Sequence, residues 1–225
     1  MTLKEISYMV LELLRKNHVV DDERLDKRLI HDWIDGKRAQ YIKNQRTKNP
    51  NGRLNLNLYQ SIDIEVEEVA VTDAGYYPYI SQVQDDNIVV STTEIPNILE
   101  DNSGPVILSI ESEDLMKIPF SVVDYDYMRI AGHGKFNSNI IFTSIRDNRI
   151  YFKYNDFFDT YTDVVIRAIF ENPRDVPGFD ADTSEYPANL GLVEYIKNSI
   201  FDVDAKILYI GQADEVSDSS GEIKK

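Results

Sequence analysis

The sequence predicts an α+β protein with an N-terminal helical hairpin, an antiparallel β-sandwich or open barrel, and a C-terminal helix followed by a flexible tail. Apolar residues recur at helical spacing before residue 50, short alternating runs fill residues 60 to 170, and helical spacing returns near residue 188. Hydrophobic residues make up 42% of the 225 residues, which is enough to build a packed core.

The first helix is expected to begin at Leu3 and to end near Asn17. Thr2 and Glu5 have the spacing of a capping box, in which each side chain accepts a hydrogen bond from the other residue's backbone N–H. The apolar side chains then recur every three or four residues, as one face of a helix requires: Leu3, Ile6, Met9, Val10, Leu13 and Leu14.

A second helix is expected to begin at Asp21 or Asp22 and to end before the turn sequence Asn49-Pro50-Asn51-Gly52. Its apolar residues recur at helical spacing: Leu25, Leu29, Ile30, Trp33, Ile34, Tyr41 and Ile42. The residues between them form a polar, mostly basic face: Arg24, Lys27, Arg28, Lys37, Arg38 and Lys43. Gly36 weakens this helix locally, and the two helices together predict an αα-hairpin.

The middle of the chain has the texture of short strands. Residues 62–66 alternate apolar and acidic side chains, as a half-buried strand does. Further β-like runs occupy residues 88–90, 106–110, 140–145, 150–154 and 164–170. Residues 146–149 have the composition of a hairpin turn, so this region is expected to be an antiparallel sandwich or open barrel.

After Asn172-Pro173 the sequence predicts a long loop, a third helix over residues 188–201 and an acidic tail from Gly211 onward. We therefore divide the chain into four parts. They are a basic helical hairpin (1–53), an antiparallel β domain (54–172), a loop with the C-terminal helix (173–210) and an acidic flexible tail (211–225).

Charge is unevenly distributed along the chain. Residues 1–53 contain 12 Lys/Arg and 8 Asp/Glu, a net charge of +4, whereas residues 54–225 contain 12 and 31, a net charge of −19. The acidic part is expected to repel nucleic acid, and the basic part to meet an acidic partner or the acidic part of a neighbouring copy. No apolar run reaches the length of a membrane span, and the N-terminus lacks a secretory apolar region.

The residue types and spacings of common active sites are missing from the sequence. It contains no cysteine, which excludes disulfides, thiolate catalysis and cysteine-based zinc sites. His18, His31 and His133 have no partner at a zinc-site spacing. The pairs Asp124/Asp126 and Asp202/Asp204 resemble the start of a calcium loop, but both lack its glycine and its final glutamate.

The sequence also lacks two further catalytic motifs. Gly132-His133-Gly134-Lys135 differs from a phosphate loop in its glycine spacing and in the Phe136 that follows the lysine, so a tight turn is the better interpretation. No G-x-S-x-G nucleophile motif occurs. Carboxylate pairs for glycoside cleavage depend on spatial separation, which leaves that class open. We expect no catalytic residue, cofactor or metal.

The motifs that remain resemble those of one protein family in their order along the chain. They are the opening residues 4–13, the basic second helix with Asp35 and Arg38, the turn at residues 132–137, the strand ending at residues 168–173, and Tyr186-Pro187 before the last helix. Together they resemble the head-to-tail connector proteins of crAss-like and related Bacteroidetes phages. The resemblance covers residues 1–210.

This resemblance implies a structural subunit of a ring that lines or surrounds the DNA channel below the portal. It implies a twelve-fold ring, contacts with the portal and with neck or tail proteins, and DNA that passes without specific binding. The protein would then be made in the bacterial host cytoplasm and reside at the head–tail junction of the virion. The alternatives are a nucleic-acid-binding protein that uses the basic helix pair and a virion-associated hydrolase.

Three groups of residues are expected at partner interfaces. Tyrosine buries a large area yet keeps a polar tip, which suits the cluster around Pro78 to an interface. The basic helix and the acidic tail supply the charged contacts. The expected interface residues are Lys27, Arg28, Lys37, Arg38, Tyr76, Tyr77, Tyr79, Asp214, Glu215 and Asp218.

Overall fold

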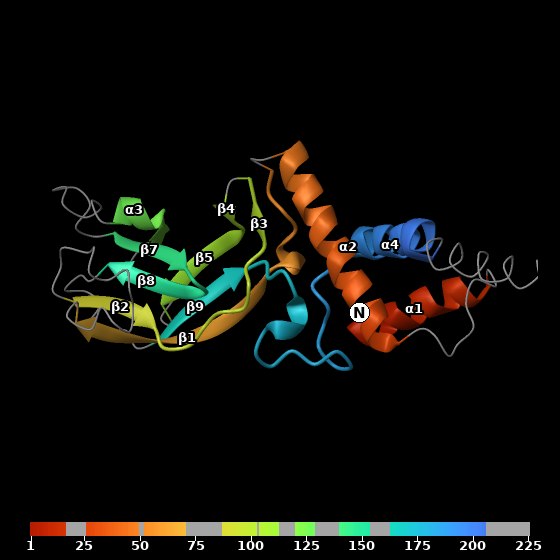
Figure 1. Ribbon diagram of the computed structural model, residues 1–225, viewed down its shortest axis with the longest axis horizontal. Helices are drawn as coiled ribbons and strands as arrows, with labels where there is room; N and C mark the ends of the chain where they lie inside the picture. The colour runs from red at the N-terminus through yellow and green to blue at the C-terminus, as the bar shows by residue number, and fades with distance from the viewer. Residues whose placement is uncertain are drawn as a thin grey trace, which may run out of the picture. The chain divides into compact units, whose positions relative to one another are not determined.

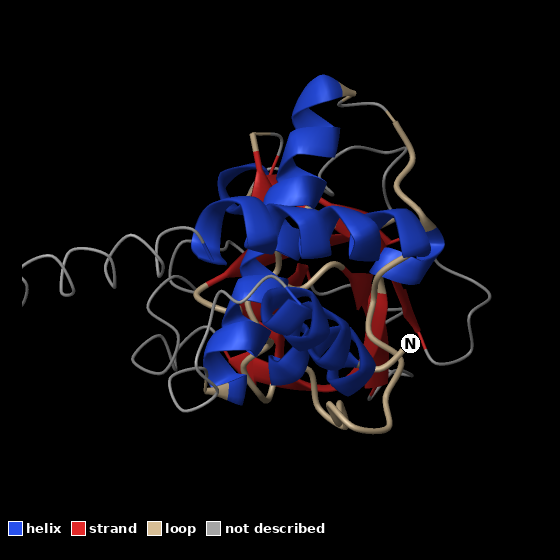
Figure 2. Cartoon of the chain, turned by 90° about the vertical axis from the view of Figure 1, so that its right-hand side faces the viewer, coloured by secondary structure: helices blue, strands red, loops and turns tan. Residues whose placement is uncertain are grey.

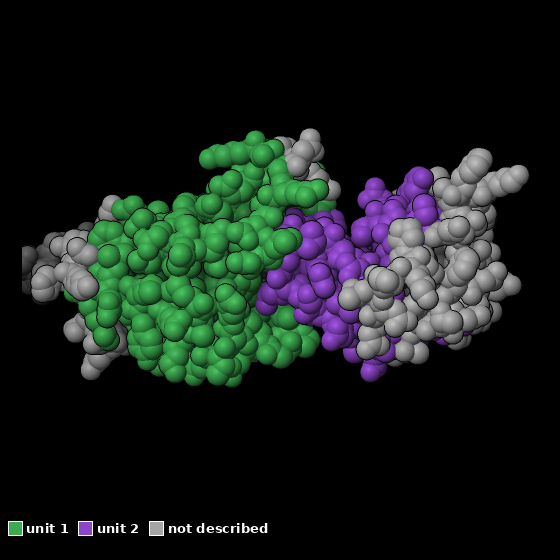
Figure 3. All heavy atoms as spheres, turned by 180° about the vertical axis from the view of Figure 1, so that it is seen from behind, with its two compact units in different colours: residues 1–58, 100–104, 171–225 green, residues 59–99, 105–170 purple. Residues whose placement is uncertain are grey.

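The computed structural model describes residues 1–16, 26–49, 52–70, 87–102, 104–112, 120–128, 140–153 and 163–205. The chain forms two compact units, drawn in green and purple in Figure 3. Unit 1 comprises residues 1–58, 100–104 and 171–225, and unit 2 comprises residues 59–99 and 105–170. The four-part division expected from the sequence stays a prediction.

Unit 1 begins with helix α1 (Leu3–Lys16), whose bounds match the prediction. The capping box is formed as expected, because the Glu5 N–H donates to Thr2 Oγ1 at 3.2 Å and the Thr2 N–H donates to Glu5 Oε2 at 2.9 Å. These two bonds satisfy backbone donors that a helix start would otherwise leave without a partner.

Helix α2 (Lys27–Lys48) begins later than the expected start at Asp21 or Asp22. Asp26 takes the cap position, with an extended backbone and a side-chain Oδ1 that accepts from the Arg28 N–H at 3.1 Å. Periodicity alone cannot choose among several Asp residues that precede a helix, because each is a suitable cap. The helix ends as predicted at the Asn49 turn, where the Gly52 N–H donates to Asn49 O at 2.9 Å.

The remaining elements of unit 1 are η2 (Leu56–Leu58), β3 (Glu100–Asp101), η6 (Pro173–Asp175), α4 (Leu190–Ser199) and the π-helix η7 (Ile200–Ala205). Helices α1, α2 and α4 contact one another (Figure 2). Their buried side chains form an apolar core. Each buried aliphatic side chain of this kind contributes about 1.5–3 kcal/mol. The core residues are Leu3, Ile6, Val10, Leu14, Ile30, Ile34, Ile42, Leu192, Val193, Ile196 and Ile200.

Unit 2 is built on a seven-stranded sheet in the order β5-β9-β1-β2-β8-β7-β6 (Figure 1). Its strands are β1 (Gln60–Ala70), β2 (Asn87–Ser91), β5 (Ile107–Ser112), β6 (Phe120–Val122), β7 (Ile141–Arg146), β8 (Arg149–Lys153) and β9 (Asp163–Ala168). The edge strands β5 and β6 also contact each other, so the sheet is a nearly closed barrel. The short strand β4 (Gly104–Pro105) is not part of this sheet.

The pairing agrees with the predicted open barrel in all but one place. Neighbouring strands are antiparallel except β6 and β7, which run parallel. Strand β1 shows the expected alternation, with Ile62 and Ile64 buried and Asp63 and Glu65 exposed. The β7–β8 hairpin turns through Asp147 (φ 51°) and Asn148 (φ 58°), the two positive φ angles that a type I′ turn requires.

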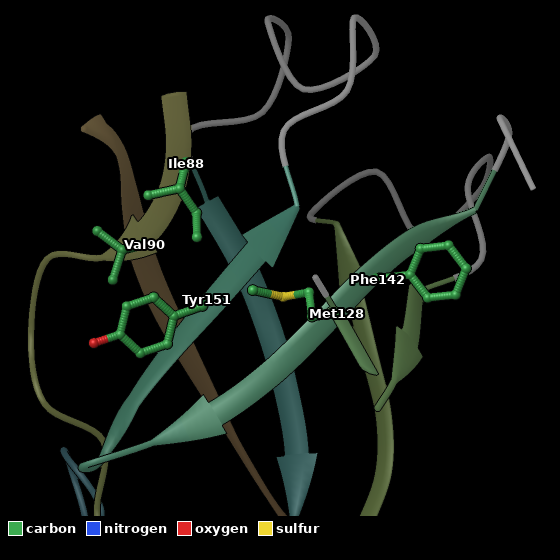
Figure 4. Close-up of a cluster of buried hydrophobic side chains, with 5 residues drawn as sticks. All are labelled: Ile88, Val90, Met128, Phe142 and Tyr151. Carbon is green, nitrogen blue, oxygen red and sulfur yellow. The ribbon is translucent and has the colours of Figure 1, made fainter. Parts of the chain in front are cut away.

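The barrel wall is also covered on part of its second face. Ile88 and Val90 of β2, Tyr151 of β8 and Phe142 of β7 are buried together with Met128 of the short helix α3 (Tyr125–Met128) (Figure 4). Strands β2, β7 and β8 therefore have apolar side chains on both faces. The α+β fold class is confirmed, while the expected flexible tail lies outside the described residues.

Candidate assembly surface

Helix α2 carries the basic residues that we expect at an interface. Lys27 and Arg28 are exposed at its start, and Lys37 is half-buried. Arg28 and Lys37 are nine residues apart, which is two and a half helical turns, so they point to opposite sides of the helix. The basic residues therefore do not share one face, and the interface role of Lys27, Arg28 and Lys37 stays a prediction.

Arg38 has a different place from the one expected, because it is buried inside unit 1 with no exposed surface. Its Nε donates to Pro187 O at 2.9 Å and its Nη2 donates to Leu58 O at 3.0 Å. Arginine can serve this role because its planar guanidinium offers five fixed donors to carbonyl oxygens. Arg38 thus ties α2 to two segments distant in the sequence, and its charge is not available on an exposed face.

Asp35, one turn before Arg38, is the centre of a second set of buried hydrogen bonds. The Tyr186 hydroxyl donates to Asp35 Oδ1 at 2.7 Å, and Arg174 Nε donates to Asp35 Oδ2 at 2.7 Å. Arg174 also pairs with Asp32 through its Nη2. The network joins α2, η6 and the segment before α4 into one structure within unit 1.

Burial dominates the electrostatics of this network. It raises the pKa of the Asp35 carboxyl, although hydrogen bonds from Tyr186 and the charge of Arg174 oppose the change. It also raises the pKa of the Tyr186 hydroxyl well above its ordinary value, and lowers the pKa of Arg38. Both oxygens of Asp35 are occupied by donors from the protein, so the arrangement is suited to holding elements together rather than to proton transfer.

An open groove of about 590 Å³ lies beside this network, along α2 and the residues around η6. Its charged side chains pair with one another, since Arg174 binds Asp32 and Asp35, and Lys43 Nζ lies 3.8 Å from Glu171 Oε1. The groove is open and is lined in part by the mid-helix residue Gly36. A Cβ added at this glycine would have no neighbour within 4 Å. A groove this open is better suited to contact with another protein than to enclosing a substrate.

Three of the sequence landmarks meet in this network: Asp35 with Arg38, Asn172-Pro173, and Tyr186-Pro187. The chain matches the family described as phage tail ring protein 2, a crAss-type ring family, over residues 5–221. The chain belongs to this family. No protein with a curated description matches the chain.

Membership in the phage tail ring family makes the chain a structural component of the virion and a ring protein of the tail. It confirms the crAss-like ring family inferred from the order of the motifs. A structural ring family also favours a role without catalysis, and it suggests that copies of the chain associate with one another and with other tail proteins.

Several residues expected to have a role in this ring protein lie outside the described residues. They are the interface residues Tyr76, Tyr77, Tyr79, Asp214, Glu215 and Asp218. Their roles stay predictions. His18 and His133, which have no partner at a zinc-site spacing in the sequence, also lie outside the described residues.

His31 lies in α2, where burial and then the charge of Arg174 lower the pKa of its imidazole. Among the described residues, no three His, Cys, Asp or Glu side chains are grouped so as to hold a metal ion. No helix in the described part of the chain is long and apolar enough to cross a membrane.

Sequence reasoning missed Arg174, which lies in a stretch expected to be a plain loop. The Asn172 side chain accepts from the Arg174 N–H at 3.1 Å and caps η6, which fixes the start of the arginine's turn. The signal was available as Asn-Pro-Arg-Asp, a cap followed by proline at the first helical position. The partners of Arg174 lie 139 and 142 residues away in sequence, which no local pattern reveals.

Proposed function

We propose that this ring protein is a subunit of the head-to-tail connector, coaxial with the DNA channel and close to the portal. The family description, phage tail ring protein 2, is the observation that carries the proposal. A ring of identical subunits uses one heterologous contact repeated until it closes. Portals of tailed phages are twelve-fold, and a matching ring of twelve subunits follows from direct stacking on the portal.

The charge of unit 2 supports a position beside DNA. Unit 2 holds 17 Asp/Glu and 7 Lys/Arg, a net charge of −10, and residues 54–116 contain no Lys or Arg. A surface of this sign repels phosphates, so DNA slides past it without being retained. A channel-lining surface needs this property, because the genome has to leave the particle through it.

The experiment is a size measurement of the purified chain, alone and mixed with the portal, followed by reconstruction of the particle. We expect a twelve-fold ring on the tail axis in the particle, and a larger species when portal is added. Isolated subunits that stay monomeric agree with the proposal if the portal acts as a template. A reconstruction with this chain away from the tail axis would contradict it.

Nucleic-acid binding through α2 is the second candidate, because this helix of 22 residues contains seven Lys/Arg and two Asp. Several of those cations are already engaged within the chain. Arg38 is buried, Arg46 Nε pairs with Asp101 Oδ2 at 2.7 Å, and Lys43 Nζ lies 3.8 Å from Glu171 Oε1. A gel shift with duplex DNA at low salt separates the candidates. A connector subunit leaves DNA unshifted, whereas a dedicated binder shifts it with a strong salt dependence.

A virion-associated hydrolase is the third reading, and zymography with purified protein tests it. The described residues give it no support, because the Asp35 carboxylate of the groove is held by donors on both oxygens. We expect no clearing of cell-wall substrate.

A further inference from the structure

A second pocket, of about 680 Å³, opens on unit 1 where α4 begins. Its walls come from α2, from the residues around η2 and from the segment that leads into α4, and it shares no lining residue with the groove beside Asp35. Two contacts hold these walls in place. The Tyr41 and Tyr195 rings pack with centroids 5.0 Å apart, and the Asn189 side chain accepts from the Leu192 N–H at 2.8 Å.

Two exposed leucines mark this pocket. Leu190 lines it and is 76% exposed, and Leu56, which stands between the lining residues Asn55 and Asn57, is 67% exposed. In the part of the chain that the structure describes, these are the two most exposed large hydrophobic side chains. Apolar side chains gathered at a hollow favour contact with another apolar surface.

The same pocket offers hydrogen-bond donors. The Oδ1 atoms of Asn55 and Asn189 accept from the backbone N–H groups of Asn57 and Leu192, at 3.0 and 2.8 Å. Their Nδ2 groups and the Tyr41 hydroxyl have no acceptor among the described residues. Such donors can bind the carbonyl oxygens of an extended backbone whatever its sequence. The pocket therefore suits a peptide segment with apolar side chains.

The charge of the pocket narrows the choice of segment. Among the described residues that line it, Glu185 carries the only charged side chain. This carboxylate is exposed and forms no ion pair with a described residue, including the amino group of Met1, which also lines the pocket. A segment that docks here gains most if it brings one cation beside its apolar residues.

The sequence beyond the described residues contains such a segment. After Ala205, where η7 ends, the chain continues as Lys206-Ile207-Leu208-Tyr209-Ile210 before it becomes polar and acidic. Four consecutive apolar residues thus follow a lysine, which is the only Lys or Arg between residues 198 and 223. We call residues 206–210 the apolar segment.

The length of the last helix keeps this segment away from the pocket of its own copy. Helices α4 and η7, of 10 and 6 residues, follow each other without a break from Leu190 to Ala205 (Figure 1). At about 1.5 Å per residue, Ala205 lies roughly 20 Å from the start of α4. The three residues from Ala205 to Leu208 span at most about 11 Å when extended. Leu208 can therefore reach this pocket only in another copy.

We propose that the apolar segment of one copy docks in this pocket of the next copy. Its apolar side chains contact Leu56 and Leu190, its carbonyl oxygens accept from the donors of the pocket, and Lys206 pairs with Glu185. The pocket lies at the start of the last helix and the segment follows its end, so the contact joins two different surfaces and repeats until a ring closes. This inference rests on the proposed function, since it assumes a ring of identical subunits.

The first test changes the apolar contact from both sides in particles assembled from variant subunits. Leu190→Asp and Leu208→Asp should each lower incorporation by about ten-fold or more, because each places a charge against apolar side chains. An acidic residue in the first turn favours a helix, so Leu190→Asp should leave α4 folded, and far-UV circular dichroism checks this. Leu108→Asp, at a leucine of unit 2 that is 44% exposed, is the matched control and should incorporate normally.

The second test exchanges the two charges. Glu185→Lys and Lys206→Glu should each lower incorporation, because each places like charges against each other in the contact. The double variant restores an opposite pair and should recover most of the loss. A double variant that is as poorly incorporated as the two single variants would contradict the pairing of Lys206 with Glu185.

The third test uses the absence of cysteine from the sequence. A chain carrying both Leu190→Cys and Leu208→Cys should form disulfides between neighbouring copies when assembled particles are treated with a mild oxidant. The product is a ladder of covalent multimers that ends at the ring size. Either single variant should give no ladder. The pair Leu108→Cys and Leu208→Cys is the geometric control and should give none either.

The outcomes separate this inference from the proposed function. Rings that give no ladder with the cysteine pair, or that form normally from Leu208→Asp, would overturn the contact and leave the connector assignment intact. A disulfide within one copy would overturn it as well. Loss of incorporation by Leu190→Asp but not by Leu208→Asp would show that a different protein occupies the pocket. A wild-type chain that forms no ring in particles would overturn both proposals.

Discussion

Replacing Tyr186 by phenylalanine tests the buried network of unit 1. The change removes one hydroxyl oxygen and keeps the ring, so the packing around Tyr186 is preserved. The Tyr186 hydroxyl donates to Asp35 Oδ1 at 2.7 Å, and both residues are buried. Without this donor, the buried Asp35 Oδ1 loses the hydrogen bond from Tyr186, while Oδ2 keeps the bond from Arg174.

The cost follows from the charge of the acceptor. A hydrogen bond to a charged group contributes about 1.5–3 kcal/mol, and a buried group left without a partner pays its full desolvation cost. We expect Tyr186→Phe to lower the free energy of unfolding by about 1.5–3 kcal/mol. For a chain of this size, that corresponds to a melting temperature lower by roughly 3–12 °C.

The chain offers a local probe for this measurement. Its single tryptophan, Trp33, lies in α2, so its fluorescence in a urea titration reports on unit 1 separately from the barrel. Tyr8→Phe is the matched control, because Tyr8 is 51% exposed, and it should change the stability by less than about 0.5 kcal/mol. A Tyr186→Phe variant as stable as this control would refute the assigned role of the network.

Three further changes follow from single positions. Gly36→Ala should stabilise unit 1 by about 0.5–1 kcal/mol in the same titration, because the Cβ meets open space and alanine favours the helix; a loss of stability would show an unseen contact. Asn189→Ala should cost about 1 kcal/mol, since its side chain caps α4 through the Leu192 N–H, and unchanged urea midpoints would contradict this. The third change concerns pH. Burial and the charge of Arg174 lower the pKa of the His31 imidazole below 6.5, so in this range the unfolded chain binds more protons than the folded chain. The free energy of unfolding therefore falls as the pH drops from about 7 to about 5. His31→Gln should remove this slope between pH 7 and 5, and equal slopes in both proteins would show that His31 does not cause it.

The elements with strong local signals were predictable. The capping box at Thr2 and Glu5, the alternation from Ile62 to Glu65 and the turn at residues 146–149 each depend on neighbours within a few residues. The start of α2 was not predictable, because several aspartates precede the helix and each is a suitable cap. Tertiary packing decides that Asp26 is the cap. The parallel pairing of β6 with β7 was not predictable either, since the three residues of β6 were not among the β-like runs found in the sequence.

The sequence did not show which charged residues of α2 are exposed and which are buried. Lys27, Arg28 and Arg38 look alike in a basic helix, yet Arg38 is buried because two carbonyl oxygens from distant segments surround it. Only the fold shows which cations are exposed and which are internal. The neighbours of the outward carboxylates Asp63 and Glu65 are also hidden from the sequence, because they depend on the register of β1 with β9, which are far apart in sequence.

The interrupted course of unit 1 has a consequence for synthesis. Helices α1 and α2 leave the ribosome first, but α4, which covers their apolar side, follows only after residues 59–170 have been made. At about 5–20 residues per second, this delay is roughly 6–22 s. During that time the apolar surface of α1 and α2 that α4 contacts in the folded chain is exposed to water, so host chaperones have time to bind it. If residues 1–58 were expressed without residues 171–225, this apolar surface would stay exposed. Co-expression of residues 171–225 would be needed to cover it.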